Sequence, residues 1–196
     1  MSYTFVYIFC ATPFGCADEF QAFQDTLGEF NSSEAMPRGF LFTSLVIVPA
    51  LVDKRPYQDA INYNLRMCRY YVQVLEDSWG PPQRDYEGDW AFVQRCIADP
   101  ELPMREAAIL FKAPLLPHKV DPAIVELKQR LLVAQASSLR RQAGDLPHIV
   151  PDKLENQANL ARAFDNLEQF RAALRGLLSD WLDSVVAERG AGAGAD

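Results

Sequence analysis

The sequence predicts an α/β domain built on a doubly wound, mostly parallel five-stranded sheet. Three observations lead to this fold class. Short apolar runs alternate along the chain with segments of helical periodicity. The apolar runs are continuous, which is typical of strands that helices cover on both faces of a parallel sheet. The length of 196 residues suits one domain.

The expected strands are four clear apolar runs and one short one. Each of the first four is rich in β-branched or aromatic residues. They cover residues 3–11, 40–48, 70–75 and 107–111, and residues 148–150 form the short fifth candidate. Short right-handed connections permit the flavodoxin-like strand order 2-1-3-4-5, although the pattern alone does not fix it.

The expected helices lie between these strands. Apolar residues recur at helical spacing in residues 18–30 and in the segment that Pro56 opens. Asp85 and Asp121 stand where they can cap the next two helices. Pro122 follows Asp121 at the first helical position, which favours proline.

The C-terminal part has a different character. From residue 152 to residue 188 there is no proline, and Gly176 is the only glycine. Apolar residues follow a four-three spacing, which predicts one long amphipathic helix of about 50 Å, either bent near Gly176 or projecting. The expected division is a flavodoxin-like domain at 1–150, a helix at 151–189 that packs on the domain or on a partner chain, and a disordered Gly/Ala tail at 190–196.

The composition excludes several classes of function. The chain carries 19 Lys and Arg against 26 Asp and Glu, a net charge of −7, and its first 114 residues hold 15 acids against 9 bases. An acidic surface argues against binding to nucleic acid or to anionic lipid. No apolar run reaches the roughly 20 residues that span a bilayer. The N-terminus has no basic region before its first apolar run, so we expect a cytoplasmic protein.

The spacing of cysteines and histidines indicates neither a metal site nor a thiol nucleophile. The four cysteines form no C-x-x-C pair, and the two histidines stand in no metal-binding frame. We therefore expect reduced thiols, no metal and no resident cofactor. Cys10 lies inside a strand, and Cys16 has no histidine near it in sequence. His118 follows the fourth strand and can in principle reach a site at the edge where the strands end.

Two loops at that edge form the candidate ligand site, because open α/β sheets bind ligands beyond the carboxyl ends of their strands. The first loop, residues 12–18, contains neither G-x-G-x-x-G nor G-x-x-x-x-G-K-[ST], so it is not a phosphate cradle. Thr12 offers a hydroxyl there, and Gly15 lets backbone N–H groups approach a ligand. The alternative is a plain turn between strand and helix.

The second loop, residues 76–87, is richer in chemistry. Asp77 follows the third strand directly, Trp79 offers a stacking surface, and Glu87 lies in the first turn of the next helix. A carboxylate there can bind a ribose or polarise a leaving group. Each residue also has a structural alternative: Glu87 as a helix-dipole acid worth about 0.3–1 kcal/mol, Asp77 as a turn or cap acid, and Trp79 as a core-closing side chain.

The stretch from Arg69 to Gly80, followed by Tyr86 and Glu87 at the start of a helix, resembles a TIR-like family. This family is the uncharacterised domain often found N-terminal to STAND-type signalling NTPases. Its third strand ends in a Y-V-x-I-x-G-x-R-Y-G pattern, and its first strand ends in I-S-S-T-F before an acidic helix. The matching residues near the N-terminus are Phe9 to Thr12, Phe14 and Glu19. The likeness covers roughly residues 3–114.

The resemblance implies a sheet related to TIR domains and nucleoside deoxyribosyltransferases, and it leaves two functions open. The first is a TIR-like cytosolic signalling or protein-interaction module that self-associates or binds a partner protein through its C-terminal helix. The second is a hydrolase or transferase acting on the N-glycosidic bond of a nucleoside or NAD, with Glu87 as the catalytic carboxylate. A nucleoside or nucleotide is the ligand class that the resemblance implies. The expected ligand-binding residues are Thr12, Phe14, Asp77, Trp79 and Tyr86.

Overall fold

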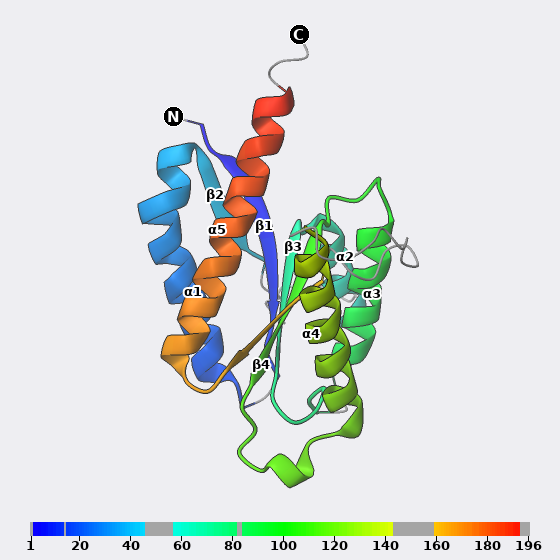
Figure 1. The fold of residues 1–196 in the computed structure, drawn as a ribbon. Coiled ribbons are helices and arrows are strands. Elements are labelled where there is room, and N and C mark those ends of the chain that lie inside the picture. The colour runs from blue at the N-terminus through cyan, green and yellow to red at the C-terminus, as the bar shows by residue number, and fades with distance from the viewer. Residues whose placement is uncertain (1, 14, 46–56, 82–83, 143–158, 193–196) are drawn as a thin grey trace.

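A five-stranded parallel sheet in the order β2-β1-β3-β4-β5 organises the molecule. The computed structural model describes residues 2–13, 15–45, 57–81, 84–142 and 159–192 (Figure 1). The strands are β1 (Thr4–Ala11), β2 (Phe40–Ser44), β3 (Tyr70–Leu75), β4 (Glu106–Lys112) and β5 (Asn159–Phe164). All neighbouring strands are parallel. The predicted fold class and strand order are therefore confirmed.

Among the described residues, five α-helices cover the two faces of the sheet. They are α1 (Ala17–Phe30), α2 (Tyr57–Met67), α3 (Tyr86–Ala98), α4 (Pro122–Gln142) and α5 (Leu167–Gly192). Short helical segments follow α1 at Asn31–Ala35 and Met36–Arg38 and precede α4 at Pro117–Lys119. Both predicted caps form: the Asp85 carboxylate accepts from the N–H of Gly88 at 2.8 Å, and that of Asp121 accepts from the N–H of Ala123 at 2.9 Å.

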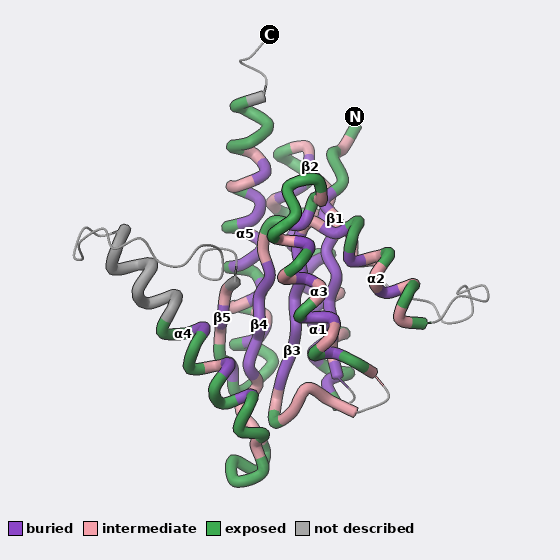
Figure 2. The backbone as a smooth tube through the Cα atoms, turned by 90° about the vertical axis from the view of Figure 1, so that its right-hand side faces the viewer, coloured by how far each residue is buried: buried purple, intermediate pink, exposed green. Residues whose placement is uncertain are grey.

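The sheet separates two apolar cores. Helices α1 and α5 lie on one face, and α2, α3 and α4 lie on the other (Figure 1). Strand β3 is buried along its whole length, and β4 is buried except at its ends (Figure 2). Consecutive strand residues point to opposite faces. Accordingly, Tyr70 belongs to the core beneath α5, and Tyr71 belongs to the core beneath α3.

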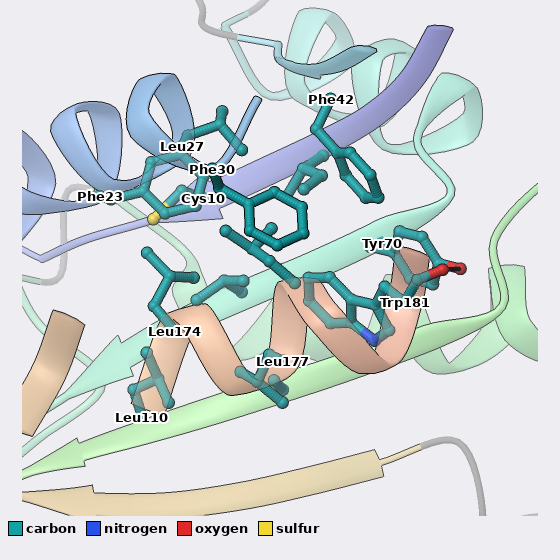
Figure 3. Packing of buried hydrophobic residues seen from close by; sticks show 14 of the residues in the cluster. Cys10, Phe23, Leu27, Phe30, Phe42, Tyr70, Leu110, Leu174, Leu177 and Trp181 are labelled. Atoms are coloured by element: carbon teal, nitrogen blue, oxygen red, sulfur yellow. Dashed lines mark hydrogen bonds between the residues drawn. The ribbon is translucent and has the colours of Figure 1, made fainter. Parts of the chain in front are cut away.

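An aromatic stack anchors α5 to the sheet. The ring of Trp181 lies 4.3 Å from that of Tyr70 and almost parallel to it (Figure 3). The Trp181 indole N–H donates to Glu106 Oε2 at 2.8 Å. The large ring is therefore buried with its one donor satisfied, which is the usual requirement for a buried tryptophan.

The prediction of one helix over residues 151–189 is wrong at residues 159–164, which form β5. The strand pairs with β4 over six residues. Its side chains alternate between the faces, with Ala161 in the core beneath α4 and Phe164 in the core beneath α5. Residues 148–150, the predicted fifth strand, lie outside the described residues.

A reciprocal cap separates β5 from α5. The Asn166 side chain accepts from the N–H of Gln169 at 2.9 Å, and the Gln169 side chain accepts from the N–H of Asp165 at 2.8 Å. These contacts satisfy N–H groups at the helix start, in the manner of a capping box. The chain can therefore turn sharply from strand to helix within two residues.

The apolar stripe of helix α5 packs against the sheet of its own domain. Its 26 residues span about 39 Å at 1.5 Å per residue. The side chains buried against the sheet are Phe170, Leu174, Leu177, Leu178, Trp181, Leu182 and Val185. Its C-terminal end extends beyond the sheet (Figure 1). Residues 190–192 are helical, contrary to the predicted tail, and 193–196 lie outside the described residues. Among the described residues, no helix is long and apolar enough to cross a membrane.

Candidate functional site

The loops that follow β1 and β3 meet at the edge where the strands end. The Tyr86 hydroxyl donates to the backbone oxygen of Thr12 at 2.9 Å. Gly80 adopts a φ of 106°, and a Cβ at this position would lie 3.0 Å from Pro13 Cβ and 3.1 Å from the Tyr86 ring. A residue with a side chain would be strained here in two ways, by its backbone and by these contacts. The close approach of the two loops therefore depends on glycine.

A cavity of about 160 Å³ opens beside this contact, at the carboxyl end of β1. Its walls come from the end of β1, the start of α1, the end of β2, the start of α2 and the loop before α3. The residues that give it chemical character are Thr12, Phe20, Tyr57, Arg84 and Tyr86. Pockets for drug-sized ligands are about 300–1,000 Å³. This cavity therefore suits a single ring system rather than a whole dinucleotide.

Arg84 is the charged residue of the cavity wall. Its guanidinium carbon lies 4.7 Å from the centre of the Tyr86 ring and 5.8 Å from that of Tyr57. These distances are in the range of cation–π contacts. The guanidinium also forms an ion pair with Asp89 of α3. The cavity therefore joins aromatic faces to a planar group of hydrogen-bond donors.

Asp89 is the buried carboxylate of this region. It is fully shielded from solvent, and Arg84 is 12% exposed at its side chain. Gln58 of α2 bridges the pair, because its Nε2 donates to Asp89 Oδ1 at 2.6 Å and its Oε1 accepts from Arg84 Nη1 at 3.2 Å. A buried charge needs such a partner to be tolerated. The three side chains thereby hold α2, α3 and the loop before α3 together.

Two tyrosines near the cavity stay neutral. Burial raises the pKa of Tyr86, and Arg84 offsets part of this effect. Burial and the charge of Asp89 raise the pKa of Tyr71 well above its usual value. Both phenols therefore keep their protons at neutral pH. The Tyr86 hydroxyl donates to Thr12, and the Tyr71 hydroxyl donates to Gln73 Oε1 inside the core.

The predicted site residues lie at different distances from this cavity. Thr12 and Tyr86 line it. Glu87 is exposed on the first turn of α3, and Asp77 is exposed with its carboxylate accepting from the Ser78 hydroxyl at 3.1 Å. Trp79 is half-buried and packs against the core beneath α3. Phe14 lies outside the described residues. The catalytic role of Glu87 stays a prediction.

Sequence reasoning missed Tyr57, Gln58, Arg84 and Asp89. Arg84 carried one usable signal, since it is the only base in the predicted loop at residues 76–87. Asp89 carried another, since its spacing from Tyr86 and Trp90 puts it on the buried face of α3. Tyr57 and Gln58 had none, because their place beside the cavity depends on how α2 packs against α3.

A second polar cluster lies at the same edge on the α1 side. Lys112 Nζ, at the end of β4, lies 2.9 Å from Glu19 Oε1 and 3.5 Å from Glu76 Oε2. Burial lowers the pKa of Lys112, but the hydrogen bond and the charge of Glu19 outweigh it and raise the pKa. Burial, with help from Glu19, raises the pKa of the nearby Cys16 thiol to about 11. Cys16 is therefore a thiol at neutral pH and a weak nucleophile.

Neither a metal centre nor a histidine dyad emerges from the described residues. No group of three or more His, Cys, Asp or Glu side chains among them could hold a metal ion. His118 is exposed on the short helical turn after β4. What the described site offers is a ring-sized cavity with aromatic, hydroxyl and guanidinium groups.

Fold and site together define the class of protein: a flavodoxin-like parallel α/β domain with a small cavity at the carboxyl end of its first strand. No model of a known protein family matches the chain. A search of curated proteins gives no match either. The TIR-like resemblance therefore stays a proposal.

Among solved structures, the chain is similar to general stress protein 14 from Treponema denticola in complex with FMN. The two chains are 11% identical, and the match covers 92% of this chain and 98% of that chain with a TM-score of 0.40. A likeness this distant says nothing of what the present chain binds.

Proposed function

We propose that this chain is a recognition module for a nucleoside-type ligand, whose ring enters the cavity at the carboxyl end of β1. The observation that carries the proposal is the cavity wall itself. It combines the rings of Tyr57 and Tyr86 with the Thr12 segment and the Arg84 guanidinium. Aromatic faces and a few fixed polar groups are what small-molecule sites use to bind and orient a planar ring.

The position of the cavity supports the proposal independently of its lining. Ligands of open α/β sheets bind outside the carboxyl ends of the strands, where the chain reverses strand order. In the order 2-1-3-4-5, the reversal lies at β1 and β3. The cavity lies at the end of β1, and the loop after β3 supplies Arg84.

Recognition is favoured over bond cleavage by the placement of the carboxylates. Cleavage of an N-glycosidic bond needs a carboxylate that faces the reacting atoms. Glu87 is exposed, and Asp89 is committed to Arg84 and Gln58. We therefore propose a signalling or interaction module that senses a ligand, and we keep the N-glycosidic hydrolase or transferase as the competing function.

The experiment is a titration of nucleosides into the full chain by calorimetry, with parallel chromatography for free base. Saturable binding without release of base supports the proposal. Release of base that is lost in Glu87→Gln would establish the enzymatic function instead. No binding of any nucleoside would refute both.

Self-association through α5 is the second part of this proposal. The apolar stripe of α5 is buried on its own sheet, and Glu188 and Arg189 near its end contact the domain as well. A partner would therefore meet the outer face of the helix or its last turn.

A further inference from the structure

We infer that the cavity selects rings that present two adjacent hydrogen-bond acceptors on one edge, as hypoxanthine and guanine do, and that Arg84 is the selecting residue. The inference rests on the proposed function, because it concerns the ring that the cavity holds. Neither the fold nor the sequence motifs assign such a preference among rings to this cavity.

The Arg84 guanidinium carries more donors than its contacts within the protein use. A guanidinium has five N–H donors in one plane. Its Nη1 donates to Gln58, and its Nη2 pairs with Asp89. These contacts do not use up the five donors, and Arg84 lines the cavity. A planar fork of N–H groups binds two neighbouring acceptors at once.

The surrounding side chains hold the Arg84 guanidinium in place. Asp89 is fully buried and Gln58 links it to Arg84, so the guanidinium is fixed from behind by α2 and α3. The rings of Tyr57 and Tyr86 hold it from the sides. A donor group that is fixed before binding loses little entropy when the ligand arrives. Asp89 is therefore a positioning residue for Arg84.

The charges around the cavity favour a neutral ligand. Asp89 neutralises Arg84. The same edge of the sheet carries three acids, Glu19, Glu76 and Asp77, against the base Lys112, which pairs with the first two. A phosphate or carboxylate would meet this negative field, so a neutral ring with acceptor atoms is the better partner. The guanine edge presents N7 and O6 as acceptors, whereas adenine presents N7 and an N6 donor. Adenine therefore sets a donor against the donors of Arg84.

The test compares inosine, guanosine and adenosine by calorimetric titration into the wild-type chain. Inosine and guanosine share the acceptor pair, and they should bind with similar affinity. Adenosine should bind more weakly by roughly 5- to 150-fold, the discrimination that a bidentate arginine gives between bases. Equal affinity for inosine and adenosine would overturn the inference and leave the proposed function standing.

Two variants identify the selecting group. Arg84→Lys keeps a cation beside Asp89 but has no fork, so the preference for inosine over adenosine should disappear. Asp89→Asn should reduce the preference, because Arg84 is held less firmly. Thermal unfolding of each variant shows whether it is folded. A folded Arg84→Lys that keeps the wild-type preference would contradict the assignment, and absence of nucleoside binding in the wild type would overturn the proposed function and this inference together.

Discussion

The buried pair of Asp89 and Arg84 makes a sharp prediction about stability. Replacing Asp89 with alanine leaves the Arg84 guanidinium, only 12% exposed at its side chain, without its counter-charge. Breaking a buried ion pair from one side typically costs about 3–5 kcal/mol. We expect a loss of that size in the free energy of unfolding of Asp89→Ala, measured by urea denaturation at pH 7.

The double variant Asp89→Ala, Arg84→Met separates the cost of the lone charge from the worth of the pair. It removes both charges and keeps apolar volume, so it should recover most of the loss. Asp183→Ala is the matched control, because the Asp183 and Arg38 side chains are 68% and 41% exposed and form a surface pair at 2.8 Å. Such a pair contributes about 0–1 kcal/mol.

Two results would refute a charge-based role for this pair. Asp89→Ala could lower the free energy of unfolding no more than Asp183→Ala does. In that case the Arg84 guanidinium finds other partners or solvent, and Asp89 does not hold it in place. If the double variant is less stable than Asp89→Ala, the pair stabilises through packing rather than through charge.

Four further changes test other features of the molecule. Burial raises the pKa of Glu106 above its unfolded value, although the hydrogen bond from the Trp181 indole opposes this. The free energy of unfolding therefore falls as the pH rises through the folded pKa of Glu106. Glu106→Gln should flatten that fall in urea denaturation between pH 4 and 7. Gly80→Ala should cost about 1–3 kcal/mol, because it forces a side chain into a left-handed backbone, and thermal unfolding that matches the wild type would contradict this. Glu87→Gln should leave nucleoside affinity within twofold, about 0.4 kcal/mol, and a larger loss in calorimetry would move the site toward α3. Light scattering of the full chain and of a chain ending at Arg189, which keeps the contacts of α5 with its own domain, tests self-association, and two monomers would refute it.

The sequence predicted most of the sheet and missed one strand for a definite physical reason. Strands β1 to β4 are continuous apolar runs, which few helices resemble. In β5, Leu160 and Phe164 stand four residues apart. A spacing of four puts two residues on the same face in both a helix and a strand, so the pattern did not distinguish them.

In the candidate site, chain order predicted the loops, whereas contacts between distant segments could not be predicted. The two loops were predicted because each follows a strand, and this depends only on chain order. Glu87 and Asp89 lie two residues apart at the start of α3, so they point about 200° apart around the helix. Asp89 shares its face with the buried Tyr86 and Trp90, so helical spacing alone places it toward the interior. Its partner Gln58 comes from α2, and no local pattern contains that contact.

The most direct test of the central claim is an NMR titration of the full, isotope-labelled chain with inosine. The account predicts saturable shifts at the backbone amides of Thr12, Tyr57, Arg84 and Tyr86, and none along the outer face of α5. Shifts confined to another surface, or no shifts at millimolar inosine, would contradict a nucleoside site at the end of β1.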